Sequence, residues 1–187
     1  RAAHPGLQLK LLDMPIAAVI RAVADGDTDL ALAYDVPDTT VLRTLFSSEW
    51  PIGAVVPPDH PLTARATTTL ADCVGFALIL PAAALSLRTI LDGAFGRSAI
   101  GVSPIVETTS TALMRKLVAQ RQGVALLNRL DIEEDLRAGT LVFVPLRDAG
   151  LQPQRLSLVA RPGNGPSPAA GLLAAQVIDC LEEALVR

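Results

Sequence analysis

Hydrophobic and polar residues follow three successive patterns in the first part of the chain. Leucines alternate with polar residues from Leu7 to Leu12, which is typical of a half-exposed strand. Apolar residues then recur at helical spacing between Pro15, which suits a first helical turn, and Gly26, which suits a helix end. Leu30 to Tyr34 is apolar throughout, so we expect a parallel strand that is covered on both faces. Together these patterns predict a βαβ unit.

Strands and helices continue to alternate up to the C-terminus. An extended region is expected over residues 41–56, with Pro51 as an interruption. The pattern restarts after Pro57, which indicates a lobe boundary. Further strands are expected at 76–80, 105–108, 124–127, 141–146 and 155–160, and helices at 87–95, 110–123, 131–137 and 173–185. The sequence therefore predicts an α/β fold of two lobes, residues 1–57 with 157–187 and residues 58–156.

Composition limits the classes of protein that remain. Half of the residues are hydrophobic and 19% are charged, so the chain can bury a core. The net charge of −3 gives no basic surface for nucleic acid, and we expect no DNA binding by this portion. No apolar run approaches the roughly 20 residues that span a bilayer. Cys73 and Cys180 are interpreted as buried thiols in a reducing compartment. The first residues also lack the apolar region of a secretion signal, and we therefore expect a cytoplasmic location, unless an upstream segment has been removed.

Patterns typical of catalysis are not found. His4 and His60 have no local signature of a catalytic triad, and the two histidines and two cysteines are too scattered to predict a metal site. No glycine-rich phosphate loop follows a strand. We therefore expect neither an enzyme nor a bound cofactor.

Four short segments occur in an order that is informative over nearly the whole chain. They are the run Asp25-Gly26-Asp27-Thr28-Asp29-Leu30-Ala31-Leu32-Ala33, the crossing Val55-Val56-Pro57-Pro58-Asp59-His60-Pro61-Leu62, the segment Leu70-Ala71-Asp72 and the block Gly123-Val124-Ala125-Leu126-Leu127. In this order the chain resembles the effector-binding domain of LysR-type transcriptional regulators, which has a periplasmic-binding-protein-like fold of type 2.

The resemblance implies a sensor. It implies a small-molecule effector bound between two lobes, two hinge crossings, assembly as a homodimer or homotetramer, and DNA binding through an N-terminal helix-turn-helix domain. The hinge residues that it implies are Pro57, Pro58, His60 and Val159.

The chain departs from the family pattern in two places. Asn128 stands where the family usually has proline, so the local turn is expected to differ. The family domain also opens with a strand and helix that precede the segment matched by Arg1 to Gly6. That strand belongs centrally in the first lobe, between the segments Leu7–Leu12 and Leu30–Tyr34. Without it, strand edges would remain unpaired, which predicts a longer natural polypeptide.

Candidate effector-binding residues lie where strands end and helices begin. Ser86 and Ser110 each precede a predicted helix, and the hydroxyl-rich run around Ser110 includes Thr109 and Thr111. Helix N-termini favour anions, so a carboxylate-bearing effector is expected; alternatively, these serines are only helix caps. Tyr34 and Asp35 follow a predicted strand and are candidates too, although they could equally form a turn. Arg88 is interpreted as either an anion ligand or a surface arginine.

Two functions from different classes fit these features. The first is the effector-sensing domain of a LysR-type regulator. The alternative is a periplasmic solute-binding protein of a transporter, which would share the fold and the pocket. The two differ in what precedes the chain, a helix-turn-helix domain or a signal peptide.

Overall fold

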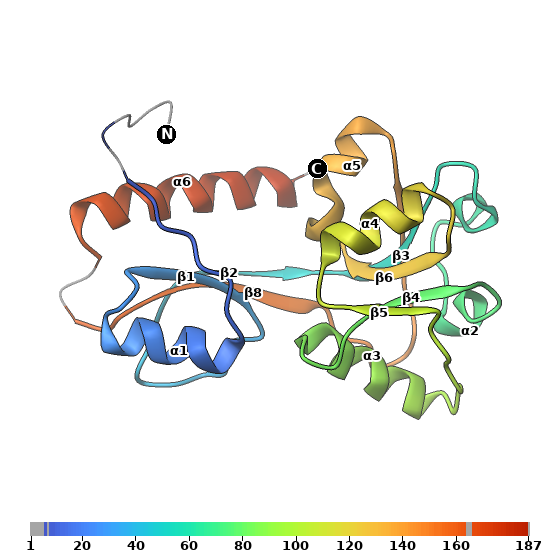
Figure 1. The fold of residues 1–187 in the computed structure, drawn as a ribbon, viewed down its shortest axis with the longest axis horizontal. Coiled ribbons are helices and arrows are strands. Elements are labelled where there is room, and N and C mark those ends of the chain that lie inside the picture. The colour runs from blue at the N-terminus through green and yellow to red at the C-terminus, as the bar shows by residue number, and fades with distance from the viewer. Residues whose placement is uncertain (1–5, 7, 164–165, 187) are drawn as a thin grey trace. The chain divides into compact units, whose positions relative to one another are not determined.

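A computed structural model describes residue 6 and residues 8–163 and 166–186 of the chain (Figure 1). The chain divides into two compact units. Unit 1 comprises residues 1–48 and 155–187, and unit 2 comprises residues 49–154. The first boundary comes earlier than the predicted one near residue 57. The reason is that the strand which follows Pro51 pairs with two strands of unit 2.

Unit 1 is built around a three-stranded sheet in the order β1-β8-β2. Its strands are β1 (Leu30–Tyr34), β2 (Arg43–Trp50) and β8 (Gln154–Ala160). The last two residues of β2 and the first residue of β8 belong to unit 2. Its helices are α1 (Ile16–Asp25) and α6 (Pro168–Leu185). The helix predicted from Pro15 is confirmed, and Gly26 ends it in the left-handed conformation, with φ of 83°.

Two predictions for unit 1 are wrong. Residues 8–12 form no strand and are exposed, and Leu7 lies outside the described residues. β1 is antiparallel to β8, with Leu30 opposite Ala160, so no parallel βαβ unit forms. β1 is also only partly buried, and Leu32 keeps 47% of its surface exposed. Alternation in sequence predicts which face of a strand is apolar, but it cannot supply the neighbouring strand.

Unit 2 contains a five-stranded sheet in the order β5-β4-β6-β3-β7. The strands are β3 (Ile52–Val56), β4 (Leu78–Pro81), β5 (Val106–Thr108), β6 (Val124–Asn128) and β7 (Val142–Pro145). β4 is parallel to both β5 and β6, whereas β3 is antiparallel to β6 and β7. All strands that the sequence predicted for this part of the chain are present.

Helices cover both faces of this sheet. They are α2 (Leu70–Cys73), α3 (Ser86–Arg97), α4 (Thr111–Ala119) and α5 (Glu133–Ala138), with the 3-10 turns η1 (Pro61–Ala64) and η2 (Leu130–Ile132). Figure 1 shows α3 on one side of the sheet and α4 on the other. The chain passes from β4 to β5 and then back across β4 to β6, so its two crossovers run in opposite directions.

The core of unit 2 explains why its strands read as continuous apolar runs. Every residue of β3, β4 and β6 is buried, as expected for strands that are covered on both faces. Met114 and Val118 of α4 are fully buried in the same cluster, as is Cys73. The second cysteine differs from its prediction. Cys180 is exposed, because it lies on the outer side of α6.

Candidate functional site

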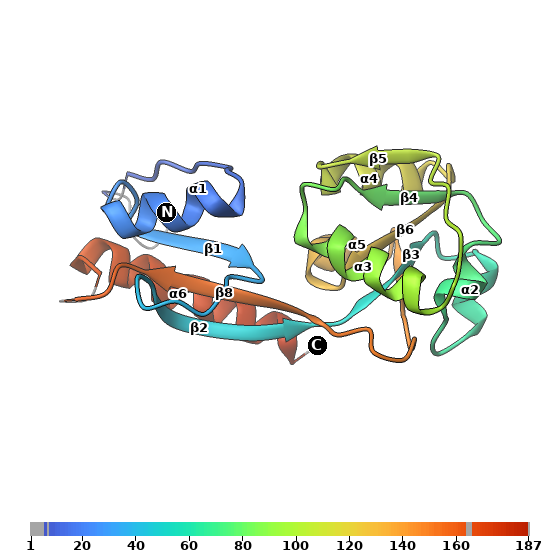
Figure 2. The ribbon, with the colours of Figure 1, turned by 90° about the horizontal axis from the view of Figure 1, so that it is seen from below.

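The carboxyl ends of three parallel strands meet at one edge of the sheet in unit 2. β4 ends at Pro81, which lies opposite Thr108 at the end of β5. The N–H of Ala82 donates a hydrogen bond of 2.9 Å to the Thr108 carbonyl oxygen, which holds the two strand ends together. β6 pairs with the other side of β4 and ends at Asn128. Figure 2 shows β4 and β5 pointing in the same direction. In open α/β sheets this edge is where ligands bind.

Ser86 begins α3 at this edge. The Gln154 amide nitrogen, Nε2, donates a hydrogen bond of 3.1 Å to Ser86 Oγ. Ser86 is half-buried, whereas Gln154 keeps only 1% of its surface exposed. Ser86 is the first helical residue of α3. The residue before it, Leu85, has no side chain that could cap the helix, so no capping side chain satisfies the first N–H groups of α3.

The hydroxyl-rich run around Ser110 leads from β5 into α4. Thr108 Oγ1 accepts a hydrogen bond of 3.1 Å from the Ser110 N–H, and Ser110 Oγ accepts one of 3.2 Å from the Leu113 N–H. Ser110 is therefore a helix cap, as one of the two interpretations proposed. The hydroxyls of Thr109 and Thr111 make no hydrogen bond to any described residue. They are available to a ligand.

Arg88 forms ion pairs with two carboxylates of its own unit. Its guanidinium donates hydrogen bonds of 2.7 Å to Asp92 and 2.7 Å to Glu107, and a third of 3.1 Å to the Pro81 carbonyl oxygen. The hydrogen bonds to Asp92 and Glu107 raise the pKa of Arg88. An anion at the strand ends would have to compete with both carboxylates for this side chain, which favours the surface-arginine interpretation.

Tyr34 and Asp35 belong to unit 1, at the end of β1. Asp35 adopts a left-handed backbone conformation with φ of 52°. Its N–H donates 2.7 Å to the Arg155 carbonyl oxygen, and its carboxylate accepts a 3.2 Å hydrogen bond from the Arg155 N–H. Asp35 therefore closes the β1–β8 pair, which supports the turn interpretation that the sequence left open.

The chain crosses from one unit to the other at residues 48–49 and again at residues 154–155. None of the four predicted hinge residues lies at these two crossings. Val159 is fully buried in β8 opposite Ala31, and Pro57 and Pro58 follow β3. His60 Nδ1 accepts a hydrogen bond of 3.3 Å from the Leu62 N–H and so caps η1. Burial lowers the pKa of His60, which agrees with an unprotonated Nδ1. The hinge role of these residues stays a prediction.

Sequence reasoning missed a buried polar cluster at the end of β6. Asn128 and Gln154 each keep 1% of their surface exposed, and Asn128 Nδ2 donates 3.0 Å to Gln154 Oε1. Nearby Asp131 is largely buried, and burial raises the pKa of its carboxyl to about 6, against the opposing effects of the Asn128 backbone and Arg115. The signal in the sequence was Asn128 itself, an amide at the end of an otherwise apolar strand.

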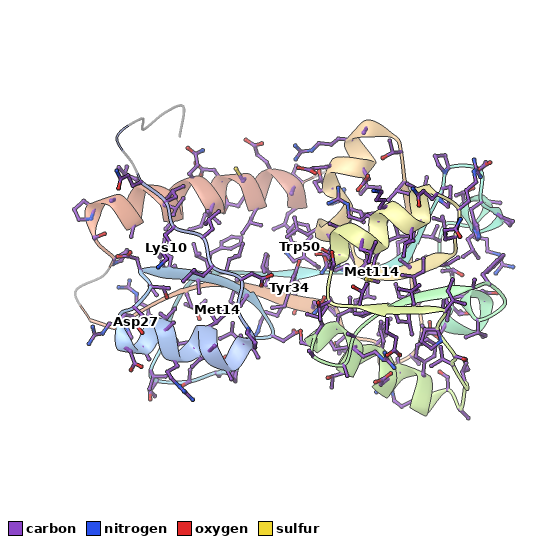
Figure 3. All side chains as sticks on the ribbon, in the orientation of Figure 1. Lys10, Met14, Asp27, Tyr34, Trp50 and Met114 are labelled. Carbon is purple, nitrogen blue, oxygen red and sulfur yellow. The ribbon has the colours of Figure 1, made fainter. Side chains whose placement is uncertain are left out.

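Unit 1 carries a cavity of about 450 Å³ beside the outer edge of β1. Its lining comes from residues 8–12, from β1 and the turn before it, and from the start of α6. Figure 3 labels Lys10, Met14 and Asp27 from this lining. β1 pairs with β8 alone in the described sheet, so one edge of β1 faces this region without a strand partner.

Other classes of site find no support in the part of the chain that the structure describes. Among those residues, no group of three or more His, Cys, Asp or Glu side chains could hold a metal ion. Over residues 8–163 and 166–186, no helix has both the length and the apolar character needed to cross a membrane.

Comparison with known proteins places this chain in a family. The family model for the LysR substrate binding domain matches residues 1–184. The HTH-type transcriptional regulator BbuR of Bordetella bronchiseptica is 28% identical over 149 residues, which cover 79% of this chain and 45% of that protein. The chain thus spans about half the length of the curated relatives it matches.

Solved structures agree in fold at low sequence identity. The effector-binding domain of QuiR in complex with shikimate has a TM-score of 0.69 and 17% identity, and the match covers 90% of this chain and 79% of that one. The effector-binding domain of BenM with its effector benzoate has a TM-score of 0.65 and 19% identity, with 91% and 77% covered. The family model covers nearly the whole chain, and the chain belongs to the LysR substrate binding domain family.

Proposed function

We propose that this chain is the effector-sensing domain of a LysR-type transcriptional regulator and that it binds a small anionic metabolite at the strand ends of unit 2. The observation that carries the proposal is the convergence of hydroxyl groups and helix starts at the ends of β4 and β5. Ser86 begins α3 there, and Thr109, Ser110 and Thr111 lead into α4. The family match supports a regulator domain rather than a transporter's solute-binding protein.

The chemistry of the site favours an anion held by neutral donors. The N-termini of α3 and α4 carry N–H groups and the positive ends of helix dipoles, and both attract carboxylates. The hydroxyls of Thr109 and Thr111 add donors that no described residue uses. QuiR and BenM were solved with shikimate and benzoate, which are both carboxylates, and this agrees with the ligand class proposed here.

The proposal for the whole protein goes further than this chain. A helix-turn-helix domain elsewhere in the polypeptide would bind DNA, and effector binding would shift the equilibrium between arrangements of protomers. An effector can do so only through different affinities for the two arrangements. Assembly as a homodimer or homotetramer in the cytoplasm is part of this proposal. The exposed Leu172 and Leu185 of α6 offer apolar surface for such contacts.

Binding of organic acids tests the site directly. Isothermal titration calorimetry would be carried out with benzoate and shikimate on the wild-type chain and on Thr111→Val, which removes a hydroxyl at nearly constant volume. We expect the substitution to weaken carboxylate binding by about tenfold or more, as for a lost hydrogen bond to a charged group.

Thr67→Val is the matched control. Thr67 is in unit 2 as well and is exposed, whereas Thr111 is half-buried; Thr67 precedes α2, on the way to the opposite end of β4. This variant should bind like the wild type. Equal affinities for all three proteins would remove Thr111 from the site, and the failure of all organic acids to bind would contradict the proposed ligand class.

A further inference from the structure

A chain of three hydrogen bonds leads from the backbone after β6 to Ser86. The Asp131 N–H donates 3.0 Å to Asn128 Oδ1. Asn128 Nδ2 donates 3.0 Å to Gln154 Oε1, and Gln154 Nε2 donates 3.1 Å to Ser86 Oγ. All four residues belong to unit 2. The two amides in the middle are buried, so these hydrogen bonds are shielded from competing water.

The direction of this chain is set at its first member. A backbone N–H can only donate, so the oxygen of the Asn128 amide must face Asp131 and its nitrogen must face Gln154. The Gln154 oxygen accepts that bond, which turns the Gln154 nitrogen toward Ser86. Rotation of either amide would bring donor against donor inside the protein, which is costly for buried groups.

The hydrogen bond from Gln154 favours a donor role for the Ser86 hydroxyl toward a ligand. Its oxygen accepts the hydrogen bond from Gln154, and its own hydrogen takes no part in the chain. A hydroxyl has one donor and two acceptor positions, so an occupied oxygen favours use of the O–H as a donor. Ser86 is half-buried and begins α3 at the strand-end edge, where this hydrogen can meet a ligand.

We propose that the buried Asn128–Gln154 pair positions the Ser86 hydroxyl as a hydrogen-bond donor and so selects effectors that present an acceptor, such as a carboxylate, over ligands that present a cationic donor. This inference rests on the proposed effector site in unit 2. It makes Asn128 and Gln154 positioning residues, because they act on the ligand through Ser86. The device depends on the amide at position 128, where a proline side chain would offer no hydrogen bond.

Asn128→Asp is expected to reverse the direction of the hydrogen bonds between position 128, Gln154 and Ser86, while Ser86 itself is unchanged. A carboxylate at position 128 still accepts from the Asp131 N–H, but it cannot donate to Gln154. The Gln154 amide then turns its nitrogen toward position 128 and its oxygen toward Ser86, so the Ser86 hydrogen is drawn to Gln154. Gln154→Met is the second variant, because it breaks the chain without adding a charge.

The test is a double-mutant cycle with matched probes. Benzoate and benzamidine have the same planar shape, but the first presents acceptors and the second presents donors. Their affinities would be measured by calorimetry for the wild-type chain, Asn128→Asp, Gln154→Met, Ser86→Ala and the double variants with Ser86→Ala. Backbone amide NMR shifts at Ser86 and Leu87 would report binding at this position.

We expect Asn128→Asp to weaken benzoate binding by about tenfold and to shift the preference toward benzamidine. In the Ser86→Ala background, Asn128→Asp should lose most of this effect, and what remains measures repulsion from the added charge. Gln154→Met should weaken benzoate binding less, and only when Ser86 is present.

The alternatives give different results. If the pair serves stability alone, the variants lower the melting temperature in both backgrounds and leave the ratio of benzoate to benzamidine affinity unchanged, which overturns the inference but not the proposed function. Benzoate binding with strictly additive effects also overturns the inference alone. If neither benzoate nor any other organic acid shifts the Ser86 amide, the strand-end site fails and the inference fails with it.

Discussion

The Ser110 hydroxyl oxygen accepts a hydrogen bond of 3.2 Å from the Leu113 N–H and so caps α4. This bond uses the oxygen and leaves the hydroxyl hydrogen for another partner. Ser110 can therefore serve the helix and a ligand at the same time. The sequence left two interpretations of Ser110 open, a helix cap or a ligand contact. Only a substitution that preserves the cap can separate them.

Ser110→Asp is such a substitution. Aspartate caps helices about as well as serine, so the free energy of unfolding should change by less than about 0.5 kcal/mol. Its carboxylate has no hydrogen to donate and repels an anion, so carboxylate binding should be lost. Ser110→Asn, which keeps both a cap oxygen and a donor, should retain binding. Calorimetry and thermal unfolding of both variants check this, and undiminished benzoate affinity in Ser110→Asp would remove Ser110 from the site.

Gly123 allows β6 to start in close contact with β4. A Cβ at this position would lie 2.4 Å from the Ala77 carbonyl oxygen, which also accepts a 2.8 Å hydrogen bond from the Val124 N–H. Gly123→Ala should therefore cost about 1–3 kcal/mol of stability, as overpacking does. Gly171 in α6 has no atom within 4 Å of a Cβ, so Gly171→Ala should gain about 0.5–1 kcal/mol. Urea unfolding of both variants measures the contrast, and equal effects would refute the steric account.

Asp131 makes stability depend on pH. Burial raises the pKa of its carboxyl from 3.8 to about 6, so the folded state resists ionisation more than the unfolded state does. This residue's contribution is fully present below pH 3.8 and is lost as the pH rises through about 6. Asp131→Asn should therefore unfold like the wild type near pH 4 and be more stable near pH 7, by on the order of 2 kcal/mol. A pH-independent difference in urea unfolding would contradict the assignment.

The outer edge of β1 predicts an additional strand. The Asp35 N–H donates a hydrogen bond to the Arg155 carbonyl oxygen in β8, so by alternation the N–H of Ala31 faces β8 and that of Leu32 faces outward, beside the cavity. In the 187-residue chain, the Leu32 amide should exchange hydrogen rapidly and the Ala31 amide slowly. In a polypeptide extended upstream of Arg1, Leu32 should become protected. Unchanged exchange at Leu32 would speak against a strand at this edge.

Local pattern was sufficient wherever an element depends on its own residues. The helix that begins after Pro15 and ends before Gly26 was predicted because its apolar spacing and its end signal are contiguous in sequence. The buried strands of unit 2 were predicted for a similar reason, since burial on both faces makes the whole run apolar. Ser86 and Ser110 were found because a serine before an apolar helical run marks a helix start.

Partners distant in sequence decided the rest. The segment from Leu7 to Leu12 has the alternation of a strand, but no described strand pairs with its described residues, 8–12. β1 has the sequence of a buried parallel strand, yet it pairs antiparallel with β8, more than 120 residues away. By itself, the sequence determined the family, the strand-end hydroxyls and most helix and strand segments, with the segment Leu7–Leu12 as an exception. Only the tertiary structure decided strand partners and the Asn128–Gln154–Ser86 hydrogen bonds, because hydrogen-bond geometry depends on which distant groups folding brings into contact.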